Sequence, residues 1–435
     1  MYECGVKTRR LPAFCLLLAL ENNYTAVILT KKSVCTQCMD APYDCGMTIS
    51  DTKTSPTSIY APEHEAFRES FRAFVDSRIA PQYGQWERDG ILPRRLFTEA
   101  GSHGFLGTSI DEEYGGGGVP DFRFNAVIAE EVARAGVVSF GINLHNDICI
   151  PYFLRYGNGE QKKRWLPGLA SGALIAAIAM TEPGTGSDLA GISTSAVRDG
   201  DSYVLNGSKT FISNGINADL IIVAARSEND ASRHAALSLF VVERDTAGFT
   251  RGRNLDKIGM HGQDTAELFF QDARIPAENL LGQLGGGFRA LVSNLPQERL
   301  TIAIASAAAA QQAVTLAVDY VKERKAFGKT IGDFQNTRFV LASAQTEVEM
   351  LRTFVDSCLA EHIDGKLSAD RAAMAKMAAT EIQGRVTDQC LQMFGGYGYM
   401  TEYPIARAYV DARVQRIYGG TNEIMREIVG KSMGL

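Results

Sequence analysis

The chain has 435 residues, of which 45% are hydrophobic and 22% are charged, and its formal net charge is −6. This length leaves room for two or three domains with sizeable cores, and the acidic balance argues against nucleic acid as a partner. No apolar stretch reaches the roughly 20 residues needed to span a bilayer, so we expect no membrane span.

The first 46 residues differ in composition from the rest of the chain. Five of the eight cysteines lie there, namely Cys4, Cys15, Cys35, Cys38 and Cys45. Such uneven placement does not suit a disulfide framework and favours a reducing compartment, which we take to be the cytoplasm. Cys35 and Cys38 have the spacing of half a zinc site, but no second half follows, so we expect no bound metal.

A short apolar run from Leu11 to Leu20 follows several basic residues and resembles a weak targeting sequence. Acidic residues flank this run, and no clean cleavage site follows it. We therefore expect residues 1–58 to be an extension without ordered structure, with Met47 as the working start. The alternative is that residues 1–46 are a transit peptide, which would place the protein in the mitochondrial matrix.

Residues 59–177 are predicted to form an N-terminal helical domain. Apolar residues recur at steps of three and four, which is the period of a helix face. This pattern covers residues 63–80, 94–101, 121–135 and 159–169. The glycine-rich stretch 111–118 must be a loop, and its glycines do not form a dinucleotide-binding fingerprint after a strand.

Residues 178–284 are predicted to form a small, barrel-like β-domain. Short runs rich in Ile, Val, Leu and Phe begin slightly before it and indicate strands at 174–180, 202–206, 219–225, 237–243 and 266–271. Turns are expected at Asp199-Gly200, Asn206-Gly207, Asn214-Gly215 and Ala247-Gly248. A β-domain between two helical ones leaves a cleft where the three meet.

Residues 285–435 are predicted to form a C-terminal helical bundle of four or five helices. The expected helices are 288–325, 334–363, 368–394, about 404–415 and 421–432. The whole chain is thus mostly α-helical, with a β-domain inserted between the helical parts.

One carboxylate interrupts an apolar helix face in this bundle. The face comprises Leu291, Leu295, Glu298, Ile302 and Ala305. Burial would raise the pKa of Glu298 toward neutrality, as a general base requires. The alternative is a glutamate that reaches water or pairs with an arginine. A proline two residues earlier should kink the helix, opening it for a ligand, or start a new one.

Five other short motifs combine glycines with polar or charged side chains: Met180–Asp188, Asn206–Gly215, Arg324–Gly328, Gln392–Gly398 and Ile417–Ile424. The first suits a backbone that approaches a flavin or a pyrophosphate, and the second is expected to be a hairpin. In the last, Thr421 is expected to cap a helix. Taken singly, each motif also has an ordinary explanation, such as a turn, a core aromatic residue or charge compensation at a helix end.

Together and in this order, the motifs resemble those of the acyl-CoA dehydrogenases over nearly all of residues 60–435. The resemblance includes Phe334-Gln335 and the stretch from Thr401 to Pro404. It implies a helical–β–helical fold that binds FAD without a Rossmann domain. The residues that it assigns to FAD are Ile178, Met180, Thr181, Gly186, Ser187, Phe211, Ile212, Ser213, Arg324, Phe327, Gln335, Gln392, Met393, Phe394, Gly395, Gly396, Thr421, Asn422 and Glu423.

The same resemblance assigns acyl-CoA contacts to Ser187, Pro296, Gln297, Arg299, Gly419 and Gly420. Many members have Trp at the position of Phe211 and Thr at that of Ser213, so an aromatic wall and a hydroxyl are kept. Arg324 and Gln335 are expected to reach FAD phosphates across a subunit boundary. Electron-transferring flavoprotein as the acceptor and a homotetramer, built as a dimer of dimers, are also implied.

Most members carry their catalytic glutamate at the position of Gly419, which has no carboxylate. The isovaleryl- and long-chain-type members place the base on the helix that here carries Glu298. The resemblance therefore implies that Glu298 removes the α-proton of an acyl-CoA while a hydride leaves the β-carbon for flavin N5, giving a trans-2-enoyl-CoA. Gly419 also leaves open a non-catalytic flavoprotein subunit or acyl-CoA-binding protein. An acyl-CoA oxidase is a further alternative, although oxidases usually carry an additional C-terminal domain.

Overall fold

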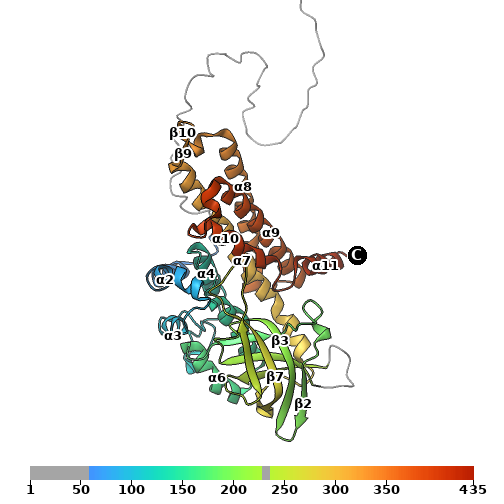
Figure 1. The fold of residues 1–435 in the computed structure, drawn as a ribbon. Helices are drawn as coiled ribbons and strands as arrows, with labels where there is room; N and C mark the ends of the chain where they lie inside the picture. The colour runs from blue at the N-terminus through green and yellow to red at the C-terminus, as the bar shows by residue number, and fades with distance from the viewer. Residues whose placement is uncertain (1–57, 228–235) are drawn as a thin grey trace, which may run out of the picture. The chain divides into compact units, whose positions relative to one another are not determined.

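The computed structural model describes residues 58–227 and 236–435. The expectations about the N-terminal extension, its cysteines and its start at Met47 fall outside these residues. The described part begins with helices, continues through a β-sheet and ends with long helices (Figure 1). This order is the one predicted from the sequence.

The N-terminal helices are α1 (Pro62–Phe74), α2 (Ala80–Asp89), α3 (Arg95–Ser102), α4 (Arg123–Arg134), α5 (Ile150–Tyr156) and α6 (Gly159–Ser171). Helices α1 to α4 contribute to an aromatic-rich core that includes Phe71, Phe105 and Phe140, whereas α5 and α6 pack in a second core together with strands of the sheet. Two segments have π-helical hydrogen bonding, η2 (Val75–Ile79) and η4 (Leu144–Cys149). The loop predicted at 111–118 contains one short 3₁₀ turn, η3 (Glu112–Tyr114).

The β-strands of the middle region form one eight-stranded sheet in the order β6-β7-β3-β2-β4-β5-β8, with β1 paired in parallel to β4. They are β1 (Ala176–Ala179), β2 (Ser195–Asp199), β3 (Ser202–Ser213), β4 (Leu220–Arg226), β5 (Leu237–Glu243), β6 (Phe249–Asn254), β7 (Thr265–Pro276) and β8 (Leu280–Leu281). The central strands β4 and β5 are buried along nearly their whole length. All five predicted strands are present, and β2, β6 and β8 were not predicted.

The turn expected at Asn206-Gly207 is wrong, and with it the hairpin expected over Asn206–Gly215. These residues lie inside β3, where the pairing with β7 shifts by a β-bulge. Gly207 has a φ of +146°, and a Cβ there would lie 2.6 Å from Oγ1 of Thr194. The glycine therefore serves a close approach between neighbouring segments inside the sheet, and the chain does not reverse there.

The C-terminal helices pack side by side, with α7 in contact with α8, α9 and α4. They are α7 (Gly287–Glu323), α8 (Gln335–Ile363), α9 (Ala369–Met393), α10 (Pro404–Ala412) and α11 (Asn422–Ser432), and a two-stranded hairpin, β9 (Lys325–Ala326) and β10 (Lys329–Thr330), connects α7 to α8. Because α7 continues through Pro296, the expectation that this proline starts a new helix is wrong. The proposed kink, and the opening it would give a ligand, stay predictions.

Helix α7 is long and apolar enough to cross a membrane by length and composition alone, which corrects the statement that no stretch reaches that length. Over half of its most apolar window is buried by other parts of the chain. A core helix passes the same test as a membrane span, and the packing of α7 against three neighbouring helices is that of a core helix.

Candidate active site

The carboxylate of Glu298 lies buried inside the protein, with 3% of the residue exposed. The hydroxyl of Tyr152 on α5 donates a hydrogen bond to Oε1 of Glu298 at 3.1 Å. The side-chain amide of Asn294, one turn earlier on α7, donates to the same oxygen at 3.1 Å. Neither bond uses Oε2, and the alternative of a surface glutamate is excluded.

Burial raises the pKa of Glu298 above its usual value, and the hydrogen bonds from Asn294 and Tyr152 oppose this rise in part. The cause is the cost of transferring an ionised carboxylate from water into an apolar interior. A buried glutamate of this kind is suited to accept a proton near neutral pH, which is the role expected from the sequence.

The double glycine Gly419-Gly420 is held against α7 beside Glu298. Arg299, the neighbour of Glu298, donates through Nε to the carbonyl oxygen of Gly419 at 3.3 Å. The buried ammonium of Lys376 on α9 donates to the carbonyl oxygen of Gly420 at 2.9 Å. The structure thus brings together the α7 residues and the glycine loop that the sequence analysis assigned to one site.

Gly419 adopts a left-handed backbone conformation with a φ of +64°, and an added Cβ would lie 2.5 Å from Cδ1 of Ile302. Glycine adopts such a φ without a steric penalty. A residue with a side chain at this position would be strained and would also press on α7. Glycine therefore suits the backbone conformation at position 419.

The residues after this loop begin α11. As predicted, Thr421 caps the helix by accepting a hydrogen bond from the backbone N–H of Ile424. The buried side chain of Asn422 bonds to Lys376, Thr380 and Glu381. Glu423 is exposed in the first turn. Of the three predicted FAD residues here, Asn422 has its side chain fully engaged within the protein.

A buried ion pair holds the loop that follows β1. Lys209 on β3 donates to Oε1 of Glu182 at 2.9 Å and to the carbonyl oxygen of Met180 at 3.0 Å. Burial would raise the pKa of Glu182, but Lys209 and the hydrogen bonds from residues 193 and 194 lower it to about 2. The backbone of Met180 and Thr181 is held in place, while Gly186 and Ser187 lie exposed further along the loop.

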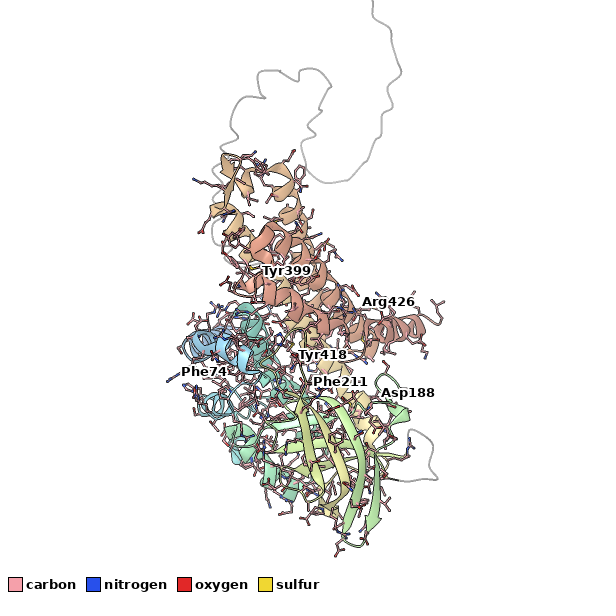
Figure 2. The ribbon with its side chains drawn as sticks, in the orientation of Figure 1. Phe74, Asp188, Phe211, Tyr399, Tyr418 and Arg426 are labelled. Carbon is pink, nitrogen blue, oxygen red and sulfur yellow. The ribbon has the colours of Figure 1, made fainter. Side chains whose placement is uncertain are left out.

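Phe211 has an exposed ring although it lies in a β-strand. It is 67% exposed, and its φ of +60° is unusual for a residue with a side chain. Such a conformation costs of order 1–3 kcal/mol and is found mainly at functional positions. The neighbouring Ile212 is buried in the core and Ser213 is half-buried, so only Phe211 of these three has a largely exposed side chain. Figure 2 marks Phe211 together with Asp188 and Tyr418.

A second group of predicted FAD residues lies at the opposite end of α7. Arg324 follows the last residue of this helix and lies over the ring of Tyr397, 5.5 Å from the ring centre. Phe327 and Gln335 lie in the connection to α8 and at its start, and residues 392–396 end α9. A helix rises 1.5 Å per residue, so Arg324 is about 39 Å from Glu298 along α7.

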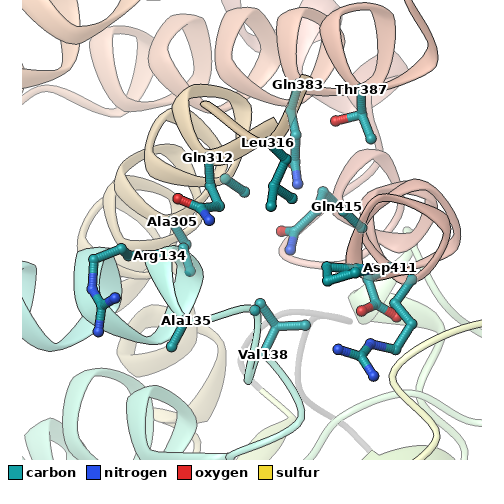
Figure 3. Close-up of a pocket in the computed structure, with 16 residues that line it drawn as sticks. Arg134, Ala135, Val138, Ala305, Gln312, Leu316, Gln383, Thr387, Asp411 and Gln415 are labelled. Atoms are coloured by element: carbon teal, nitrogen blue, oxygen red, sulfur yellow. The ribbon is translucent and has the colours of Figure 1, made fainter. Parts of the chain in front are cut away.

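A separate small cavity lies between α4, α7, α9 and α10 (Figure 3). Alanine side chains line much of it, and the side chains of Gln312, Gln383 and Gln415 border it. None of the predicted site residues lines this cavity, so it is distinct from the region around Glu298. Among the described residues, no group of histidine, cysteine and acidic side chains has the arrangement of a metal site.

Models of one protein family match the chain in three consecutive parts. The N-terminal, middle and C-terminal domains of acyl-CoA dehydrogenase match residues 61–173, 177–273 and 285–434. The long-chain specific acyl-CoA dehydrogenase of Sus scrofa is 48% identical over 376 residues, which are 86% of this chain and 87% of the relative. The chain belongs to the acyl-CoA dehydrogenase family.

Two crystal structures support this membership. The acyl-CoA dehydrogenase of Geobacillus kaustophilus is 51% identical, has a TM-score of 0.85 and covers 86% of this chain and 99% of its own. A glutaryl-CoA dehydrogenase of Mycobacterium smegmatis in complex with FADH2 is 28% identical, has a TM-score of 0.80 and covers 86% of this chain and 95% of its own. As a family member, the protein is an FAD-dependent oxidoreductase of acyl-CoA thioesters.

The described residues fit an FAD group. The exposed ring of Phe211 offers a wall for a planar ring system. An added Cβ at Gly186, Gly395 or Gly396 would meet no atom within 4 Å, so the backbone there is open to a ligand. These positions belong to three of the stretches that the sequence analysis assigned to FAD.

Four residues that hold parts of the site were not predicted from the sequence, namely Tyr152, Asn294, Lys209 and Lys376. Asn294 lies four residues before Glu298 on the same helix face, so the helical period was a signal that could have identified it. Tyr152 is 146 residues away in sequence. Nothing in the local sequence around either partner indicates that contact.

Proposed function

We propose that Glu298 is the base that removes the α-proton of an acyl-CoA. Its burial, its raised pKa and the two hydrogen bonds to Oε1 support this role, because they hold one oxygen and leave Oε2 to accept the proton. Tyr152 and Asn294 fix the orientation of the carboxylate. The observation that carries the proposal is that this buried carboxylate lies beside the arginine that binds the glycine loop.

The backbone N–H of Gly419 would hold the thioester oxygen, which makes the α-carbon more acidic. Arg299 and Lys376 bind the carbonyl oxygens of this loop and so fix the direction of its N–H groups. Ser187, Pro296, Gln297 and Gly420 remain proposed acyl-CoA contacts. Bound FAD supplies the acceptor for the hydride that leaves the β-carbon.

Residues of the Met180–Ser187 loop and Phe211–Ser213 would hold the flavin end of FAD within one subunit. Arg324, Phe327, Gln335 and residues 392–396 would bind the remainder in a second copy. The distance of about 39 Å along α7 between Glu298 and Arg324 supports this division. Exposed apolar side chains at that end and further along α8, namely Phe327 on the connection, Phe339 near the start of α8 and Met350 in its middle, support self-association, and we propose a homotetramer.

Replacing Glu298 by glutamine tests the proposed base. Glutamine keeps the shape and the contact with Asn294 but cannot accept the proton. We expect the variant to retain FAD and to lose about 10²–10⁴-fold in turnover with an acyl-CoA and an artificial electron acceptor. Near-normal turnover would contradict the assignment, whereas binding without turnover by the wild type would support a non-catalytic flavoprotein.

The pH dependence offers a further check on the base. Glu298 must be ionised to accept a proton, and burial raises its pKa, so wild-type activity should be lost as the pH falls through that raised value.

For the substrate, we propose a saturated long-chain acyl-CoA as the first to test, followed by shorter and branched chains.

Electron-transferring flavoprotein is the proposed acceptor. If oxygen instead re-oxidised the enzyme and peroxide accumulated, the oxidase alternative would be favoured. The cellular location remains a prediction, with the cytoplasm expected and the mitochondrial matrix as the alternative, because residues 1–46 lie outside the described part of the chain.

A further inference from the structure

The short π-helix η4 packs directly on the face of α7 that carries Glu298. Three side chains of α7 bond to two successive residues of η4. The amide of Asn294 donates to the carbonyl oxygen of Ile148 at 3.4 Å, and the amide of Gln297 donates to that of Asp147 at 2.6 Å. One turn further, the hydroxyl of Thr301 donates to the carboxylate of Asp147 at 3.1 Å.

The spacing of these residues places them around Glu298. Positions 294, 297, 298 and 301 differ by three and four, so they share one helix face. The bonds to η4 therefore lie both before and after the glutamate along α7. A rotation or shift of this part of α7 would break them, because their partners belong to one turn of another helix.

The carboxylate of Asp147 connects α7 to two further parts of the N-terminal region. Its Oδ1 accepts a hydrogen bond from the amide of Asn125 on α4 at 2.6 Å, and its Oδ2 accepts one from the amide of Asn143 at 3.0 Å. With Thr301, its donors are two amides and one hydroxyl, all neutral. Asp147 is 1% exposed, so a carboxylate is buried here without a cation among these partners.

Burying a carboxylate in this way costs free energy, and the burial of Asp147 raises its pKa to about 7. An apolar side chain would fill the same space without that cost. A carboxylate, however, accepts hydrogen bonds from several directions at once, so it ties α4, η4 and α7 to one point. Isolated π-helical turns also occur frequently at functional sites.

We propose that Asp147 is a positioning residue, which, through Thr301 and the η4 turn, aims the Glu298 carboxylate at the α-carbon of the substrate. This inference rests on the proposed function, in which Glu298 is the base. A misplacement of about 1 Å in a reacting group can cost about 10²-fold in rate. A contact that fixes the rotation of α7 next to Glu298 should therefore affect the rate of the chemical step more than it affects the affinity for the substrate.

A pair of substitutions at Thr301 tests this inference with little risk to folding. Thr301→Val has nearly the same shape but lacks the hydroxyl, and Thr301→Ser keeps the hydroxyl. Two quantities are measured. The first is the rate of anaerobic flavin bleaching per bound flavin at saturating acyl-CoA, and the second is the acyl-CoA concentration that gives half of this maximal rate. We expect Thr301→Val to be at least about 10-fold slower with a similar half-saturation concentration, and Thr301→Ser to remain within about twofold of the wild type.

Asp147→Asn provides a second variant. Its new amide nitrogen would face a donor, either the amide of Asn125 or that of Asn143, and could not accept that hydrogen bond, so we expect the same loss of rate. Asp219→Asn is a matched control, because Asp219 accepts bonds from Arg94, Arg244 and the N–H of Ile175, and all three of these partners lie outside α7. We expect this control to lower the melting temperature but to leave the bleaching rate per flavin unchanged.

Two outcomes would overturn the inference. In the first, Thr301→Val bleaches at the wild-type rate while Glu298→Gln does not bleach, which leaves the proposed base intact and removes only the role of Asp147. In the second, Thr301→Val and Thr301→Ser lose rate equally, because a lost hydroxyl would then not be the cause. An active Glu298→Gln would instead overturn the proposed function, and the inference with it.

Discussion

Replacing Asp411 by asparagine should stabilise the protein at pH 8 but not near pH 4.5. Asp411 lies on α10 with 7% of the residue exposed, and it accepts a hydrogen bond from the backbone N–H of Met260 at 2.5 Å. Burial raises the pKa of Asp411 from 3.8 to about 7, and the nearby Glu87 adds to this rise, while the Met260 bond and Arg407 oppose it. Asparagine keeps the acceptor for Met260 and carries no charge.

The sign of the effect follows from proton binding. Between about pH 4 and pH 7 the native state holds a proton on Asp411 that the unfolded state has released, so this group's contribution to stability falls as the pH rises. Above pH 7 the full cost of the buried charge is present. The pKa of Asp411 differs from its ordinary value by about three, and each pKa unit corresponds to ~1.4 kcal/mol. The cost of the buried charge to the free energy of unfolding is therefore at most about 4 kcal/mol.

The assay is the melting temperature of the purified FAD-bound protein and of Asp411→Asn at several pH values from 4.5 to 8. We expect the variant to gain several degrees relative to the wild type as the pH rises across this range. Asp364→Asn, which removes an exposed carboxylate beside Lys366, is the control. A difference between Asp411→Asn and wild type that is the same at every pH would refute the reasoning.

Three further predictions concern the flavin loop and the glycine loop. Phe211→Ala should lower the FAD content of the purified protein, while Phe211→Trp should keep it, because the exposed aromatic wall is then retained. Lys209→Met should lower the melting temperature and the FAD content, because it leaves the buried carboxylate of Glu182 unpaired at a cost of about 3–5 kcal/mol. The double variant Lys209→Met with Glu182→Gln should recover part of that loss. Gly419→Ala should lower turnover. Gly365→Ala is the control and should leave turnover unchanged, because Gly365 has a similar positive φ and no atom near its added Cβ. Equal effects of the two substitutions on turnover would contradict the role of the glycine loop.

Much of the fold could be predicted because its longest elements carry strong periodic patterns. Strands β4 and β5 are continuous apolar runs, and α7 repeats its buried residues at the helical period. Strand β2 was missed because its residues Ser195–Asp199 are mostly polar and partly exposed. At Asn206-Gly207, a pair of residues typical of turns instead serves a bulge, because the neighbouring segment leaves no room for a side chain.

The four apolar residues that share a helix face with Glu298 indicated that it could be buried, but they left open a glutamate that reaches water or pairs with an arginine. Tyr152, the partner of Glu298, could not be predicted, because the contact joins residues far apart in the chain and depends on how α5 packs on α7. The same limit applies to Lys376, whose buried ammonium binds the glycine loop from another helix. The sequence pattern identifies which residues are unusual, whereas packing decides what they contact.

The central claim is that Glu298 is the base of the reaction, and a single-turnover experiment tests it most directly. Wild-type protein and Glu298→Gln, each with its FAD content measured, are mixed anaerobically with an acyl-CoA that the wild type turns over, and flavin absorbance is followed. We expect rapid bleaching in the wild type and bleaching at least about 10²-fold slower in the variant, with equal FAD content. Bleaching of Glu298→Gln at the wild-type rate would contradict the claim.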